Sequence, residues 1–300
     1  MNLFSKIIEK LSEGFLYKKG KKDGEALATP VVEEAHAEEA HREAEEEPVV
    51  EEPQVEIEEP IQIEEQEVAT EEPTQEEEKS MDNDEKVLAE AKPTMKILID
   101  NGHGNNTKGK RSPYSANKTL PKIDFYEYQW NREIAGKIVE RLKEDGYDAE
   151  LLTPEETDIS LCERTRRVSA WCDRLGKDNV LMISIHANAA GNGKVWYSAR
   201  GWSAYTTKGT TVSDAVAEYL YDAAEKYLVG QRIRTDKTDG DRDYEENFYI
   251  LKYTPCAAVL TENFFYDNVQ DVKYILSEKG KENIVNLHVE GIENYINDKK

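Results

Sequence analysis

The most informative candidate for chemistry in this chain is a histidine bracketed by two glycines. His103 follows the apolar run Ile97–Ile99 and Asp100, with Gly102 and Gly104 on either side. Glycine lets the backbone turn tightly and approach a bound ion, and a neutral imidazole at the end of a strand is a common metal ligand. The turn by itself leaves two interpretations open, a metal ligand and an incidental loop histidine.

Three further groups occupy comparable places along the chain. His186 and Glu262 lie just beyond apolar runs that we predict to be buried strands, and Glu127 opens a predicted helix. Because sites in open α/β sheets form outside the carboxyl ends of strands, we expect His103, His186 and a glutamate to meet there. Two histidines and a carboxylate are a typical catalytic zinc set, and a second glutamate can carry protons. Glu127 could instead only cap its helix, since a carboxylate suits a helix N-terminus.

The elements that must position these groups alternate between strands and helices. Strands are predicted at 96–100, 148–152, 180–185 and 257–261, with one or two more within 194–206, and helices at 127–145, 160–175, 211–228 and 280–297. The continuous apolar strand at 180–185 implies burial on both faces of a sheet. The alternation predicts an α/β fold, with a single three-layer domain built on a central, largely parallel, mixed sheet flanked by helices.

Charge divides the chain into unlike parts. The whole chain has a formal net charge of −23. Most of this charge lies in the first 94 residues, which contain 10 basic and 29 acidic residues. Residues 20–94 repeat a loose Glu-Glu-Pro unit and hold few apolar side chains, so we expect a disordered acidic linker. Residues 95–300 are nearly neutral and long enough for one domain with a sizeable core. The acidic balance argues against nucleic acid as a partner.

Residues 1–19 have a pattern of their own. Their apolar side chains recur at helical spacing and charged side chains fill the other positions, which predicts an amphipathic helix for a membrane surface or a protein partner. Charges interrupt the apolar run and no small-residue cleavage site follows, so the segment does not read as a signal peptide. We find no transmembrane span in the sequence.

Four motifs, in order, resemble the zinc-dependent N-acetylmuramoyl-L-alanine amidases of the amidase_3 type. Ile99-Asp-Asn-Gly-His-Gly104 resembles the family's Asp-Pro-Gly-His-Gly turn, and Glu127-Tyr-Gln-Trp-Asn131 resembles its helix-opening motif. Ser184-Ile-His-Ala-Asn188 resembles Ser-x-His-x-Asn, and the run from Pro255 to Phe264 resembles the strand end Pro-Ala-Val-Leu-x-Glu. The resemblance covers most of residues 95–300.

The resemblance implies roles for these residues. His103, Glu127 and His186 map to the ligands of one Zn²⁺, and Glu262 maps to the catalytic glutamate that moves the proton of the attacking water. The implied reaction is hydrolysis of the amide that joins the lactyl group of N-acetylmuramic acid to L-alanine of the stem peptide. Asn101 stands where the family usually has proline, which removes no candidate ligand.

Several other polar residues have weaker patterns. Asn188, Asn131 and Arg164 are candidates for contacting substrate or for supporting the ligands, and Asn188 could equally stabilise a turn. His288 shares a predicted helix face with apolar residues, so we predict a packed histidine rather than a fourth ligand. Trp202 is predicted to pack in the core.

Two alternatives to the amidase remain open from the sequence. One is a zinc peptidase that cuts within stem peptides, and the other is a peptidoglycan-binding module without catalysis. In each case peptidoglycan is the partner, and we expect a monomer. A protein without a signal peptide would be made in the cytoplasm and reach the cell wall, in the periplasm or outside the cell, by an unassigned export route. Both wall remodelling and lysis by a phage lysin fit these expectations.

Overall fold

The computed structural model of the chain describes residues 95–113 and 122–299. The predicted amphipathic helix at 1–19 and the predicted acidic linker at 20–94 lie outside these residues. The strands are β1 (Lys96–Asn101), β2 (Asp148–Leu151), β3 (Val180–Asn188), β4 (Trp202–Thr206), β5 (Tyr244–Glu245) and β6 (Ala257–Phe265). The helices are α4 (Glu127–Glu144), α5 (Leu161–Leu175), the 3₁₀ turn η1 (Lys177–Asn179), α6 (Val212–Tyr227), α7 (Tyr249–Lys252), α8 (Val269–Leu276) and α9 (Glu278–Asp298).

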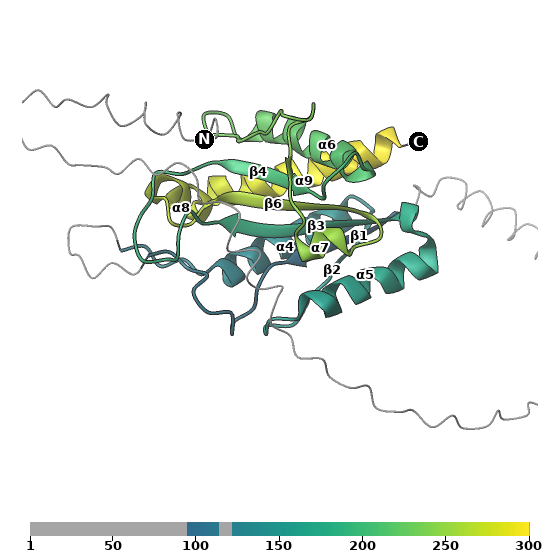
Figure 1. The fold of residues 1–300 in the computed structure, drawn as a ribbon, viewed down its shortest axis with the longest axis horizontal. Helices are drawn as coiled ribbons and strands as arrows, with labels where there is room; N and C mark the ends of the chain where they lie inside the picture. Colours follow the sequence, from purple (N-terminus) through teal and green to yellow (C-terminus); the bar gives the residue numbers. More distant parts are fainter. Residues whose placement is uncertain (1–94, 114–121, 300) are drawn as a thin grey trace, which may run out of the picture. The chain divides into compact units, whose positions relative to one another are not determined.

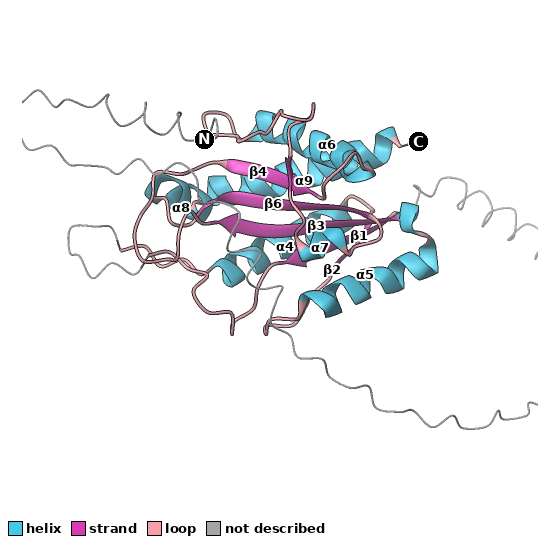
Figure 2. Cartoon of the chain, viewed as in Figure 1, coloured by secondary structure: helices cyan, strands magenta, loops and turns pink. Residues whose placement is uncertain are grey.

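One mixed sheet carries the fold, in the strand order β2-β1-β3-β6-β4-β5 (Figures 1 and 2). The strands β2, β1, β3 and β6 are parallel to one another, whereas β4 runs antiparallel to β6. The carboxyl ends of β1, β3 and β6 therefore meet at one edge of the sheet. The prediction of a largely parallel, mixed sheet flanked by helices is confirmed.

Two hydrophobic cores sandwich the sheet. Alternate side chains of the strands, such as Ile99 and Ile183, pack with the apolar faces of α4, α6 and α9. The intervening side chains, such as Leu98 and Met182, pack with α5 and α7 on the other face. Because successive strand residues point to opposite faces, burial on both sides explains why the central strands are continuously apolar.

The structure differs from the predictions at strand ends and short elements. Strands β3 and β6 run on to Asn188 and Phe265, past the apolar runs that marked them. Of the predicted strand region 194–206, only β4 forms a strand. The short elements β5, α7 and α8 were not predicted, because segments this short have too few residues to display a period. Among the described helices, none is long and apolar enough to cross a bilayer.

Candidate metal centre

The turn after β1 presents His103 in an unusual backbone conformation. The N–H of Gly102 donates to the carbonyl of Ile185 at 3.1 Å, which ties the turn to β3. His103 then has a φ of 65°, in the left-handed region that residues other than glycine seldom occupy. Such backbone strain persists where the surrounding structure holds it, and it is common at functional sites. Here it directs the imidazole toward the carboxyl end of the sheet.

Glu127 opens α4 beside this turn. Its backbone N–H donates to the carbonyl of Lys110 at 3.0 Å, so a strand-like segment before α4 pairs with residues 110–112 and fixes the start of the helix. The side chain is 2 % exposed. Glu127 Oε1 also accepts from the backbone N–H of Ala187 at 3.1 Å, so this carboxylate bridges α4 and β3 rather than merely capping its own helix.

His103, Glu127 and His186 converge. Glu127 Oε2 lies 3.5 Å from His103 Nε2, and Glu127 Oε1 lies 3.1 Å from His186 Nδ1. The two imidazole rings meet edge to face with centroids 4.9 Å apart. One ligand atom from each of the three residues lies within 4.8 Å of the others, the one such group of potential metal ligands among the described residues.

Burial and mutual charge perturb the protonation of this group. Burial lowers the pKa of His103 to about 4, although the charge of Glu127 opposes the shift. Burial alone would raise the pKa of Glu127, but the charge of His103 and the hydrogen bond to His186 outweigh it and lower that pKa to about 2. The Glu127 carboxylate is thus ionised at neutral pH and the His103 imidazole neutral, the states in which both bind metals.

Glu262 stands beside His186 on the neighbouring strand. The two residues are register partners in the parallel β3–β6 ladder, so their side chains leave the same face of the sheet. Glu262 Oε2 is shielded from solvent and has no hydrogen-bond partner among the described residues. Burial raises the pKa of this carboxyl to about 7. A carboxyl with a pKa near neutrality can both accept and donate a proton.

The residues present fit a divalent metal. A Cβ added at Gly102 would overlap the ring of His186, so the turn needs glycine to let that imidazole lie against it. Two imidazoles and a carboxylate form a three-ligand set of the kind that catalytic zinc uses, which leaves a further coordination position for water or substrate. Glu262, whose Oε2 has no hydrogen-bond partner among the described residues, is the register partner of the ligand candidate His186.

Comparison with known proteins shows the family of the chain. A family model described as N-acetylmuramoyl-L-alanine amidase matches residues 97–294. The chain belongs to this family. It is 31 % identical over 201 residues to an N-acetylmuramoyl-L-alanine amidase of Bacillus licheniformis, and the aligned region covers 66 % of this chain and 67 % of that protein. It is also 27 % identical over 212 residues to the endolysin of Bacillus phage SPP1, over 68 % and 67 % of the two chains.

Solved structures agree with the family. The crystal structure of an N-acetylmuramoyl-L-alanine amidase from Clostridium difficile 630 matches with a TM-score of 0.57 and 26 % identity, covering 69 % of this chain and 100 % of that one. The protein is therefore a peptidoglycan amidase, a cell-wall hydrolase whose substrate lies outside the cytoplasm. The family is generally zinc-dependent, in keeping with the His103, Glu127 and His186 group.

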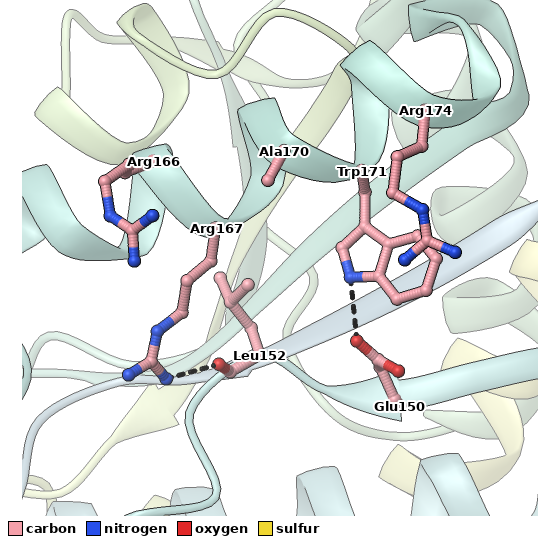
Figure 3. A pocket seen from close by; sticks show the side chains of 7 residues that line it. All are labelled: Glu150, Leu152, Arg166, Arg167, Ala170, Trp171 and Arg174. Atoms are coloured by element: carbon pink, nitrogen blue, oxygen red, sulfur yellow. Dashed lines mark hydrogen bonds between the residues drawn. The ribbon is translucent and has the colours of Figure 1, made fainter. Parts of the chain in front are cut away.

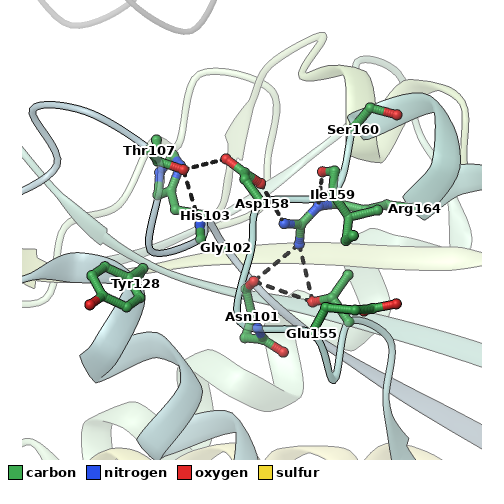
Figure 4. Close-up of polar contacts among 12 residues, drawn as sticks. Asn101, Gly102, His103, Thr107, Tyr128, Glu155, Asp158, Ile159, Ser160 and Arg164 are labelled. Carbon is green, nitrogen blue, oxygen red and sulfur yellow. Dashed lines mark hydrogen bonds and ion pairs between the residues drawn. The ribbon is translucent and has the colours of Figure 1, made fainter.

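Arg164 of the amidase is buried, and its guanidinium is paired within the protein. Its guanidinium pairs with Asp100 at the end of β1. It also donates to the carbonyl of Asn101 at 3.0 Å and to Asp158 Oδ1 at 2.9 Å (Figure 4). Asp158 in turn contacts the hydroxyl of Thr107, which accepts from the backbone N–H of Gly104 at 3.0 Å. Arg164 therefore holds both ends of the turn that carries His103.

The other two candidates also support the site from within. Asn131 is fully buried, and its Nδ2 donates to the carbonyl of Gly102 at 3.1 Å, below the His103 turn. Asn188 Oδ1 accepts from the next backbone N–H, that of Ala189, at 2.8 Å, which is the turn-stabilising contact. Asn131 Nδ2 also donates to Glu127 Oε1 at 3.5 Å, so this amide contacts one of the converging ligand atoms.

The predicted positions of two site residues need correction. His186 and Glu262 were expected beyond the ends of their strands, but both lie inside β3 and β6. The apolar runs end there because the side chains that line the site must be polar. The backbone hydrogen bonds between β3 and β6 nevertheless continue through His186 and Glu262. Sequence reasoning also missed Lys110, whose charge opposes the rise in the pKa of Glu262; its loop has no motif, and only the backbone pairing with Glu127 brings it near.

A pocket of about 300 Å³ lies elsewhere on the amidase domain, between α5 and β2 (Figure 3). It is lined by three arginines of α5, by Leu152 and Ala170, and by Trp171, whose indole N–H donates to Glu150 Oε1 at 2.9 Å. None of its lining residues belongs to the metal-binding group or to the Arg164 network. The pocket is thus separate from the candidate metal centre.

Proposed function

We propose that His103, Glu127 and His186 hold one Zn²⁺ and that Glu262 is the catalytic acid and base of the amidase. The observation that supports this assignment most is the convergence of one ligand atom from each of the three residues within 4.8 Å, at the carboxyl edge of a sheet. Glu262 follows from its register with His186. The bond cleaved is the amide between the lactyl group of N-acetylmuramic acid and L-alanine of the stem peptide.

The protein groups divide the work. A bound Zn²⁺ supplies Lewis acidity toward a water molecule and toward the carbonyl oxygen of the scissile amide. Glu262 accepts the proton of the attacking water at its unpartnered Oε2 and then delivers it to the leaving amine of L-alanine. Because the pKa of Glu262 is raised to about 7, both transfers are feasible near neutral pH.

Substitution of Glu262 separates metal binding from proton transfer. We expect Glu262→Gln to retain zinc and to lose turnover of purified peptidoglycan by about 10²–10⁴-fold, the usual contribution of a positioned acid and base. Zinc is measured by elemental analysis and products by mass spectrometry, which also tells lactyl-amide cleavage from cleavage within stem peptides. Comparable activity in this variant would contradict the role of Glu262.

His103→Ala is the matching test of the metal site. We expect this variant to lose zinc and activity together, because one of three protein ligands is removed. A variant that kept both would overturn the proposed ligand set.

We further propose that residues 1–19 form an amphipathic tether to a membrane surface or a protein partner. Residues 20–94 would then be an extended acidic spacer that gives the domain at 95–300 reach toward peptidoglycan. Deletion of residues 1–19 should abolish co-sedimentation with anionic vesicles and leave hydrolysis of soluble peptidoglycan fragments unchanged. Unchanged association with membranes and partners after the deletion would refute the tether.

A further inference from the structure

A chain of buried polar side chains runs behind Glu262. Thr261 and Asn263 flank Glu262 on β6, Trp202 lies on the adjacent strand β4, and His288 lies on α9; these four are fully buried. Since successive strand residues alternate between faces, Thr261 and Asn263 point away from the metal centre, toward α9. Buried polar groups are costly unless they are paired, so their contacts need an account.

The orientation of the Asn263 amide follows from Trp202. An indole N–H can only donate, and Trp202 Nε1 lies 2.9 Å from Asn263 Oδ1, which identifies that atom as the amide oxygen. Asn263 Nδ2 therefore faces the other way. It donates to the carbonyl of His186 at 2.9 Å and to Thr261 Oγ1 at 3.0 Å.

The same reasoning continues to α9. The hydroxyl of Thr261 accepts from Asn263, so its hydrogen is directed to His288 Nε2 at 2.9 Å. His288 Nδ1 lies 2.7 Å from the carbonyl of Ile284, which can only accept, so Nδ1 carries the imidazole proton. A neutral His288 thus completes a chain in which every donor has an acceptor.

The network ends where regular strand pairing stops. The β3–β6 ladder keeps its register up to the His186 and Glu262 pair and shifts before Asn188 pairs with Phe265. Just after this point, Phe264 has a φ of 69°, a conformation that a bulky residue adopts only when its surroundings impose it. Beyond the pair, the Asn263 amide ties β6 to the backbone of His186.

We propose that Thr261, Asn263 and His288 are positioning residues that fix the Glu262 carboxylate relative to His186. The proposal rests on the catalytic role of Glu262 proposed above. A fully paired side-chain network holds β6 against β3, β4 and α9 on either side of Glu262. Because a displacement of about 1 Å at a reacting group can cost about 10²-fold in rate, loosening this strand slows turnover even though none of the three touches substrate.

Thr261 offers the cleanest test, because valine has nearly the same shape without the hydroxyl. In the full-length zinc enzyme, we expect Thr261→Val to lower kcat for soluble peptidoglycan fragments by about tenfold or more, with KM and zinc content within twofold of wild type. Thr261→Ser restores the hydroxyl and should recover most of kcat. Tyr295→Phe is a control on α9, since the Tyr295 hydroxyl has no hydrogen-bond partner among the described residues, and it should match wild type.

Thermal melts and zinc analysis accompany the kinetics, so that loss of fold is not mistaken for loss of positioning. A kcat for Thr261→Val within twofold of wild type would overturn the proposal, as would a deficit that Thr261→Ser shares or that the unfolded fraction accounts for. If Thr261→Val does not fold, His288→Leu against His288→Gln repeats the comparison, because the glutamine amide can still accept from Thr261.

Glu262→Gln is measured in parallel. Full activity in Glu262→Gln would overturn the role of Glu262 and this inference together. An inactive Glu262→Gln beside a fully active Thr261→Val would overturn the positioning network alone.

Discussion

Arg164 allows the buried support of the His103 turn to be tested quantitatively. The side chains of Arg164 and Asp100 are each 2 % exposed, and they form an ion pair at the end of β1. Arg164→Met keeps much of the volume of the side chain but removes the guanidinium that pairs with Asp100. The buried Asp100 carboxylate then keeps the hydrogen bond from Ser184 Oγ, at 2.6 Å, but has no neutralising charge from residue 164. Removing one partner of a buried pair typically costs about 3–5 kcal/mol of unfolding free energy.

That loss should be large enough to see in a melting curve. For a domain of this size, each kcal/mol shifts the melting temperature by about 2–4 °C, so Arg164→Met should melt roughly 6–20 °C below wild type. Arg166→Met is the matched control on the same helix, because Arg166 is 68 % exposed and pairs with Glu163 on the surface. Solvent screens an exposed ion pair, which therefore contributes little to stability, so this variant should melt close to wild type.

A double variant tests the reason for the loss. If the penalty comes from the uncompensated charge, Arg164→Met combined with Asp100→Leu should recover much of the stability, because replacing both members of a buried pair by apolar residues is often neutral. Melting is followed by circular dichroism, with zinc held constant. The reasoning is refuted if Arg164→Met melts no lower than Arg166→Met.

Three further outcomes are expected. Gly102→Ala should lose zinc and activity because its new Cβ would overlap the His186 ring, whereas Gly136→Ala, where a Cβ meets no atom within 4 Å, should keep both; equal zinc content in the two variants would contradict this. Chelation should abolish hydrolysis and added Zn²⁺ should restore it, and full activity in metal-free protein would argue against a zinc mechanism. Burial lowers the pKa of His288 to about 4 from the ordinary 6.5, so the unfolded chain takes up a proton first as the pH falls. The contribution of His288 to the free energy of unfolding is then complete above about pH 6.5 and declines by up to about 1.4 kcal/mol per pH unit down to about pH 4. Chemical denaturation of wild type and His288→Gln at pH 8 and pH 5 should show that wild type loses about 2 kcal/mol more than the variant. Equal losses in the two proteins would count against a buried, neutral His288.

Much of the fold could be predicted because its determinants are local. Apolar runs such as 180–185 mark strands that are buried on both faces, and the apolar stripe of 127–145 marks an amphipathic helix. These patterns predicted the main strands and helices and, through their alternation, the layered sheet. The predicted strand ends before His186 and Glu262 were wrong, because the side chains become polar at the site while the backbone hydrogen bonds between the strands continue.

The sequence by itself determined the family, through four motifs in order, and it nominated His103, Glu127, His186 and Glu262. What it could not determine is how these side chains are held. The His103 turn is tied to β3 through Gly102 and Ile185, and the path from His288 to Trp202 likewise joins residues that lie tens of positions apart in the chain. Such contacts leave no local period in the sequence, because they depend on strand register and on helix packing across the sheet. Tertiary structure alone decides them, since a buried polar group must find its partner in whatever the fold places beside it.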